Sequence, residues 1–269
     1  MNVHVTRRIV YLVVALAVII PMLFLKGKTV TVSEPVLNAF QAIDTLKEGS
    51  YILISTDYGP GTMPEVNPMV YAIVRHAFRK NLKVVYLSVV DALGLALGDQ
   101  VIKNVAQEYD KEYGKDFVNL GFKPGAEAVI VSLGKEIRDI FPEDVRGVPL
   151  DSMEITRNIH NLKDFAIVVD FASGYGITAW IRYAQARFGV FLVGCVTAVM
   201  GPENYPYLDS GQLKGLVAGL KGAAEYETLL GKPAIATRGM PAQSAVHILI
   251  IVLIVIGNIL YLLEKGKRK

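Results

Sequence analysis

Three aspartates stand at the ends of short apolar runs that the sequence predicts as strands. Asp57, Asp91 and Asp170 each close or follow such a run. Carboxylates gathered at one edge of a sheet could bind a cation or carry out acid–base chemistry. Aspartate is also a common N-cap for the helix that follows a strand. We favour this structural role, and ligand contact is the alternative.

The other candidate ligand-binding residues lie in the loops around these aspartates. They are Tyr58, Gly61, Thr62, Ser173, Gly174 and Tyr175. The spacing of Gly174 and Gly176, between an apolar run and a helix, is part of a dinucleotide-binding fingerprint, but no acidic residue closes a second strand about twenty positions later. We therefore predict no cofactor.

Nucleophile and metal motifs are weak. Ser173 has no evident base near it in the sequence, and the four histidines do not have the spacing of a metal site. The single cysteine, Cys195, lies in an apolar run and excludes a disulfide scaffold. No metal site is predicted.

The elements that must position these residues alternate between strand and helix. The sequence predicts strands at 51–55, 83–89, 117–120, 166–170 and 190–196, and helices at 67–79, 93–113, 126–140, 177–188 and 212–230. The run at 128–133 could also be a strand, and 142–163 is irregular. This pattern is typical of an α/β fold with a doubly wound, mostly parallel sheet, Rossmann-like or flavodoxin-like. A ligand crevice is then expected at the strand carboxyl ends, in loops 56–65, 90–94, 171–176 and 197–211.

A repeat of small residues marks the last predicted helix. Gly211, Gly215, Gly219 and Ala223 recur every four positions, so we expect one helical face that allows close approach of a neighbour. The neighbour is either the domain's own sheet or another subunit.

Two uncharged apolar segments predict membrane spans at 9–25 and 245–263. The first is predicted as an uncleaved signal anchor, with a cleaved signal peptide as the alternative. Asn258 lies inside the second, where an amide is expected to find a partner in helix packing. The flanking basic residues place both termini, 1–8 and 264–269, in the cytoplasm and residues 29–242 outside it.

The charge distribution argues against nucleic-acid binding. Eight of the 28 basic residues and one of the 25 acidic residues lie in the two ends, so the middle section carries a net charge of −4. Proteins that bind a phosphate backbone depend on clustered Lys and Arg.

The segments 210–227 and 238–259 resemble the C-terminal part of a family of uncharacterised prokaryotic two-span membrane proteins, classed as a domain of unknown function. That resemblance implies no activity. We predict a membrane-anchored binding or assembly domain, a homo-oligomer or a subunit of a membrane complex, with membrane lipid around its spans and a crevice for a small ligand. The alternative is a membrane-tethered hydrolase or transferase that uses Asp57, Asp170 or Ser173.

Overall fold

The computed structural model describes residues 3–25, 27 and 30–267. The chain divides into two compact units, one of residues 30–236 and one that combines 1–29 with 237–269. The first unit contains the α/β fold and the second contains the apolar helices.

A six-stranded parallel sheet forms the centre of the α/β unit in the described part of the chain. Its strands are β1 (Tyr51–Asp57), β2 (Lys83–Ser88), β3 (Phe117–Phe122), β4 (Ile167–Ala172), β5 (Leu192–Val196) and β6 (Gly215–Ala218). They lie in the order β3-β2-β1-β4-β5-β6. This is the Rossmann order, whose two halves diverge from β1 and β4. The predicted doubly wound α/β fold is confirmed.

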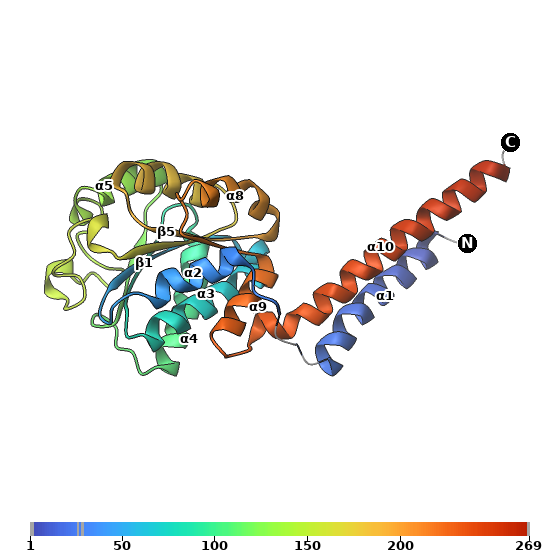
Figure 1. The fold of residues 1–269 in the computed structure, drawn as a ribbon, viewed down its shortest axis with the longest axis horizontal. Coiled ribbons are helices and arrows are strands. Elements are labelled where there is room, and N and C mark those ends of the chain that lie inside the picture. The colour runs from blue at the N-terminus through green and yellow to red at the C-terminus, as the bar shows by residue number, and fades with distance from the viewer. Residues whose placement is uncertain (1–2, 26, 28–29, 268–269) are drawn as a thin grey trace. The chain divides into compact units, whose positions relative to one another are not determined.

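Helices cover both faces of the sheet, as Figure 1 shows. One face carries α2 (Glu34–Asp44), α3 (Met63–Arg79), α4 (Ala92–Glu108) and α9 (Gly219–Leu229). The other carries α5 (Ala126–Leu133), α8 (Gly201–Asp209) and a continuous helix made of α6 (Gly176–Ala179), the π-helical η5 (Trp180–Gln185) and α7 (Ala186–Phe188). Residues 142–163 are mostly irregular with short 3-10 turns, as predicted, but the predicted helix 126–140 ends at Leu133 and is followed only by the 3-10 turn Ile137–Asp139. The β-strands are almost wholly buried because both faces are covered.

The predicted helix at 212–230 is wrong in its first third. Residues Gly215–Ala218 form the edge strand β6, and the helix α9 begins only at Gly219. Gly211 and Gly219 instead have positive φ angles of 75° and 67°, which glycine adopts readily. The four small residues therefore do not share one helical face. The predicted loop 197–211 is also wrong, since most of it is helix α8.

Close backbone approach at Gly215 is nevertheless real. A Cβ there would fall 2.2 Å from the Ala39 nitrogen of α2. The neighbour is thus a helix of the same unit, packed against β6. Ala223 is fully buried in α9.

The second unit contains two long apolar helices. These are α1 (Val3–Phe24), with Pro21 near its end, and α10 (Ile235–Lys267), whose bounds extend beyond the predicted spans. Both are long and apolar enough to cross a membrane, over Arg7–Phe24 and Ile235–Leu263. Asn258 donates from Nδ2 to the Ile254 carbonyl oxygen, one turn earlier in its own helix, at 2.8 Å. Its amide thus has a partner without a second helix.

Candidate functional site

Two of the predicted aspartates meet at the point where the sheet reverses its strand order. β1 and β4 are neighbours, and Ser55 pairs with Asp170 while Asp57 pairs with Ala172. Alternate residues of a strand share a face, so Ser55, Asp57 and Asp170 all point to the face covered by α5 and α6. Asp57 and Asp170 therefore form one buried acid pair.

Asp57 accepts hydrogen bonds from four donors. Ser55 Oγ donates to its Oδ2 at 2.5 Å. Ser88 Oγ donates to Oδ1 at 2.7 Å, and the backbone amides of Val89 and Val90 donate to the same oxygen at 2.9 and 2.8 Å. Hydrogen bonds of this kind stabilise the ionised form. Asp57 thus ties the end of β1 to the loop after β2.

Asp170 lies in the opposite situation. Its side chain is wholly buried, and among the described residues no donor reaches either of its carboxyl oxygens. Burial, followed by the nearby charge of Asp57, raises the pKa of Asp170 well above its usual range. The site therefore favours the neutral form of Asp170 beside Asp57.

Gly176 packs directly against both aspartates of the pair. A Cβ at this position would lie 2.8 Å from Asp57 Cβ and 3.2 Å from Asp170 Oδ2, so only glycine fits. Gly174, by contrast, is exposed and has open space around it. An anion at the start of α6 would face the Asp57 carboxylate, which argues against phosphate binding here.

The third aspartate has the structural role that we favoured. Asp91 is the N-cap of α4, where its Oδ1 accepts from the amides of Leu93 at 2.8 Å and Gly94 at 3.4 Å. It is not part of the acid pair.

The remaining sequence candidates separate into core and surface. Tyr58 is fully buried and donates to Asn67 Oδ1 at 2.6 Å, so it is a core residue. Gly61 is exposed, and the Thr62 hydroxyl closes its own turn on the Gly59 carbonyl at 3.1 Å. Ser173 is half-buried, and its backbone amide donates to the Asp57 carbonyl oxygen at 3.2 Å.

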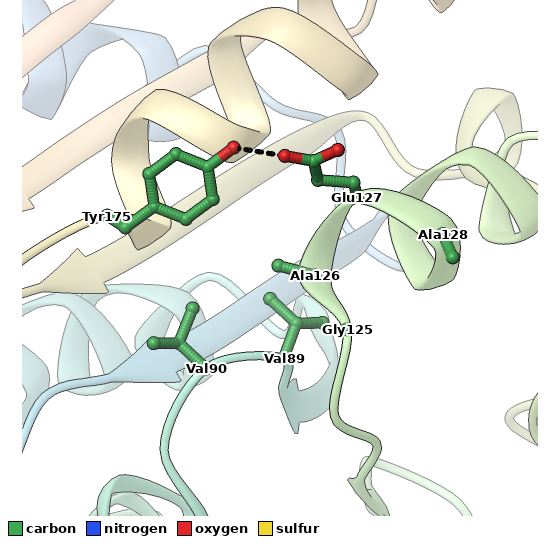
Figure 2. Close-up of a pocket in the computed structure, with 7 residues that line it drawn as sticks. All are labelled: Val89, Val90, Gly125, Ala126, Glu127, Ala128 and Tyr175. Carbon is green, nitrogen blue, oxygen red and sulfur yellow. Dashed lines mark hydrogen bonds between the residues drawn. The ribbon is translucent and has the colours of Figure 1, made fainter.

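A pocket of about 490 Å³ opens beside the acid pair, at the carboxyl ends of the strands (Figure 2). Its lining residues come from the loops after β2 and β4, from Gly125 after β3 and from the first turn of α5: Val89, Val90, Gly125, Ala126, Glu127, Ala128 and Tyr175. Only Tyr175 was predicted. The loop after β3 could have been found by the same rule, because it also follows a strand end.

The polar groups of this pocket are one phenol and one carboxylate. Tyr175 Oη donates to Glu127 Oε1 at 2.7 Å, as the dashed line in Figure 2 shows. That hydrogen bond lowers the pKa of Glu127 and raises the pKa of Tyr175 to about 12. Valine and alanine side chains form the rest of the wall. The pocket therefore offers an apolar surface with one negative charge.

The acid pair and the pocket share the loop after β2. The amides of Val89 and Val90 bind Asp57, while the same two residues line the pocket. A protonated carboxyl beside an ionised one is an arrangement that acid–base catalysis uses. Here, however, Asp170 is 0% and Asp57 3% exposed, and neither lines the pocket. The pair therefore positions the pocket wall.

Comparison of this chain with protein-family models, with curated proteins and with solved structures finds no match.

Proposed function

We propose that this chain is a membrane-anchored binding protein whose α/β unit takes a small ligand in the pocket beside the Asp57–Asp170 pair. The observation that carries this proposal is the position and size of the pocket. It lies outside the carboxyl ends of the strands where the strand order reverses, which is where open α/β sheets bind ligands. Its volume of about 490 Å³ is that of a small-molecule site.

The lining residues favour an amine with an apolar body. Glu127 is the charged residue of the lining, and it is negative. Val89, Val90 and the ring of Tyr175 provide apolar surface, and an aromatic face also attracts a cation. An ammonium group would replace the Tyr175 hydroxyl as the donor to Glu127.

Three compounds that share a phenyl ring but differ in charge test the preference for an amine. We expect 2-phenylethylamine to bind the full-length protein in mild detergent more tightly than 2-phenylethanol, and phenylacetate to bind least. Binding is read from the shift in thermal unfolding, since a ligand that binds only the folded state stabilises it. The variant Glu127→Gln should remove the preference for the amine.

A pocket-filling variant tests the location. Ala128 is exposed in the pocket wall, so Ala128→Phe should block binding without disturbing the core. Ala186→Phe places the same ring on an exposed position of α7 and serves as the control. Equal binding by the two variants, or equal binding of the amine and the carboxylate, would contradict the proposal.

Assembly with partner subunits is the second candidate, favoured by exposed apolar side chains at the same edge of the sheet. Val199 is 88% exposed and Leu93 59% exposed. Isolated exposed apolar residues are common, but several at one edge are typical of an interaction surface. Native mass spectrometry of the detergent-extracted protein should show an oligomer that Val199→Lys dissociates. A monomer in both samples would contradict assembly.

An enzyme that uses Asp57, Asp170 or Ser173 has less support, because the acid pair is covered and the Asp57 oxygens are already occupied by donors. The membrane arrangement is part of the proposal. With α1 and α10 as spans, the basic ends predict cytoplasmic termini and an α/β unit on the outer side.

A further inference from the structure

Both chain segments that lead from the α/β unit toward the apolar helices attach to helix α9. On the N-terminal side, Ser33 precedes α2. Its amide and its hydroxyl donate to Glu225 Oε2 at 2.9 and 2.5 Å. On the C-terminal side, the amides of Ala234 and Ala236 donate to Oε2 and Oε1 of Glu227 at 2.8 and 2.9 Å. The two glutamates lie two residues apart in α9.

These carboxylates are buried, which makes their donors necessary. Glu225 is 1% and Glu227 2% exposed. A buried carboxylate is strongly unfavourable unless hydrogen-bond donors or a cation surround it. Glu225 also pairs with Lys221 Nζ at 2.5 Å. Loss of Ser33 or of the Ala234–Ala236 amides would leave a buried charge with fewer partners, so release of either segment is disfavoured.

The two segments also meet one another. A Cβ at Gly27 would lie 1.9 Å from the Thr237 carbonyl oxygen, so the backbones are in contact and no side chain fits between them. Gly27 follows α1, and Thr237 is in the first turn of α10. The segments are therefore joined directly as well as through α9.

Helix α9 is itself fixed to the rest of the α/β unit. The Tyr226 hydroxyl lies 2.8 Å from His76 Nδ1 of α3, and Arg79 donates to the Leu230 carbonyl oxygen at 2.9 Å. At the other end of α9, a Cβ at Gly219 would lie 2.7 Å from Ala198 Cβ, in the loop after β5. Helix α9 thus reaches from the carboxyl edge of the sheet to both chain segments.

We propose that α9 is the coupling helix of this protein, and that Glu225 and Glu227 clamp the two membrane-directed segments to it as a pair. Any displacement of α9 then moves both segments together. This inference goes beyond ligand binding, because the clamp consists of contacts within the chain and is tested without a ligand.

Hydrogen–deuterium exchange of the full-length protein in detergent tests the clamp. Glutamine has one acceptor oxygen in place of two, so Glu227→Gln can hold only one of the two amides. We expect exchange in residues 232–240 to rise about tenfold, the effect of losing one hydrogen bond to a charged group. In Glu225→Gln both Ser33 donors can still share the one oxygen, so only the charge assistance is lost, and we expect a smaller rise of about threefold in residues 30–37. Exchange in β1 and β4 should stay unchanged.

Three further variants make the outcome decisive. Ser33→Ala removes only one hydroxyl bond and should raise exchange in 30–37 alone. Gly27→Ala should raise exchange in 232–240 without touching either glutamate. Glu203→Gln, at an exposed position of α8, is the control and should change neither segment. Exchange that stays within twofold of the parent in both segments, or that rises equally in β1, would overturn the proposal.

Discussion

Replacing each member of the acid pair by asparagine should give very different results. Asp57 is the member that accepts hydrogen bonds from several donors, whereas burial favours the neutral form of Asp170. Asn is close in shape to a protonated Asp, and its side chain is likewise neutral. Asp170→Asn should therefore leave the free energy of unfolding within about 1 kcal/mol of the parent below about pH 4, where the unfolded chain also keeps the Asp170 proton.

Asp57→Asn removes a charge that several donors share. Three hydrogen bonds converge on Asp57 Oδ1, from the Ser88 hydroxyl and from the amides of Val89 and Val90. The asparagine oxygen can take this place, but each bond loses its charge assistance, worth about 1 kcal/mol. We expect a loss of about 3 kcal/mol in the free energy of unfolding, roughly a 150-fold change in the equilibrium.

The pH dependence of the Asp170 variant has a definite sign. Because burial raises its pKa, folded Asp170 keeps its proton above pH 4, where the unfolded chain releases it. This contribution favours folding at low pH and is lost as the pH rises toward the folded-state pKa. Asp170→Asn lacks the effect, so its stability relative to the parent should increase as the pH rises above about 4, by up to about 1.4 kcal/mol per pH unit.

Denaturant unfolding of the full-length protein in mild detergent can measure these differences. Trp180 is the single tryptophan of the chain, is fully buried, and belongs to the helix that begins at Gly176 above the pair. Its fluorescence reports on this region. Equal destabilisation by the two variants, or a stability difference for Asp170→Asn that is constant with pH, would refute the assignment of one neutral and one ionised aspartate.

Three more predictions concern other parts of the chain. Burial lowers the pKa of His76 to about 4, so the stability that its neutral ring contributes is present above pH 6.5 and is lost as the pH falls toward 4. In denaturant unfolding, His76→Phe should therefore lose about 3 kcal/mol less than the parent over this pH range. Gly215→Ala places a methyl group against Ala39 and should lower the free energy of unfolding by about 3 kcal/mol. Gly211→Ala, in open space but with a positive φ, should lower it by about 1 kcal/mol. Equal losses would count against the close contact at Gly215. Cys195 is buried, so in intact cells an impermeant maleimide should label the variant Glu203→Cys but not the parent protein. Protection of the variant from labelling would place the α/β unit inside the cell.

The apolar runs were sufficient to predict five of the strands and the parallel architecture. They are continuous because the sheet is covered on both faces. The ambiguous run at 128–133 is helical, as we favoured. The sixth strand could not be recognised, because four residues, GLVA, are too few to show a period, and this run begins with a glycine and is followed by another. The four-residue spacing of Gly211, Gly215 and Gly219 is also the spacing of one helical face, which led to the wrong prediction. Two of them, Gly211 and Gly219, instead have positive φ angles.

The candidate site was predictable in position but not in the role of each residue. Sequence marks Asp57, Asp91 and Asp170 alike as strand-end aspartates. Their difference depends on the surrounding donors: two loop amides bind Asp57, Asp91 caps its own helix, and Asp170 has no donor among the described residues. Backbone amides have no sequence signature, so only the fold distinguishes an ionised, a capping and a protonated carboxyl.

The shared loop after β2 connects ligand binding to the charge of Asp57. Val89 and Val90 turn their amides toward Asp57 and their side chains toward the pocket, so the pocket wall is placed by a buried charge that the ligand does not contact. A ligand that binds this loop in its present position favours the arrangement in which the Val89 and Val90 amides donate to Asp57, and by thermodynamic reciprocity that arrangement favours the ligand. Asp57→Asn should therefore weaken binding of an amine, even though the new side chain does not contact the amine. Asp170→Asn leaves the Asp57 carboxyl in place and should not weaken binding.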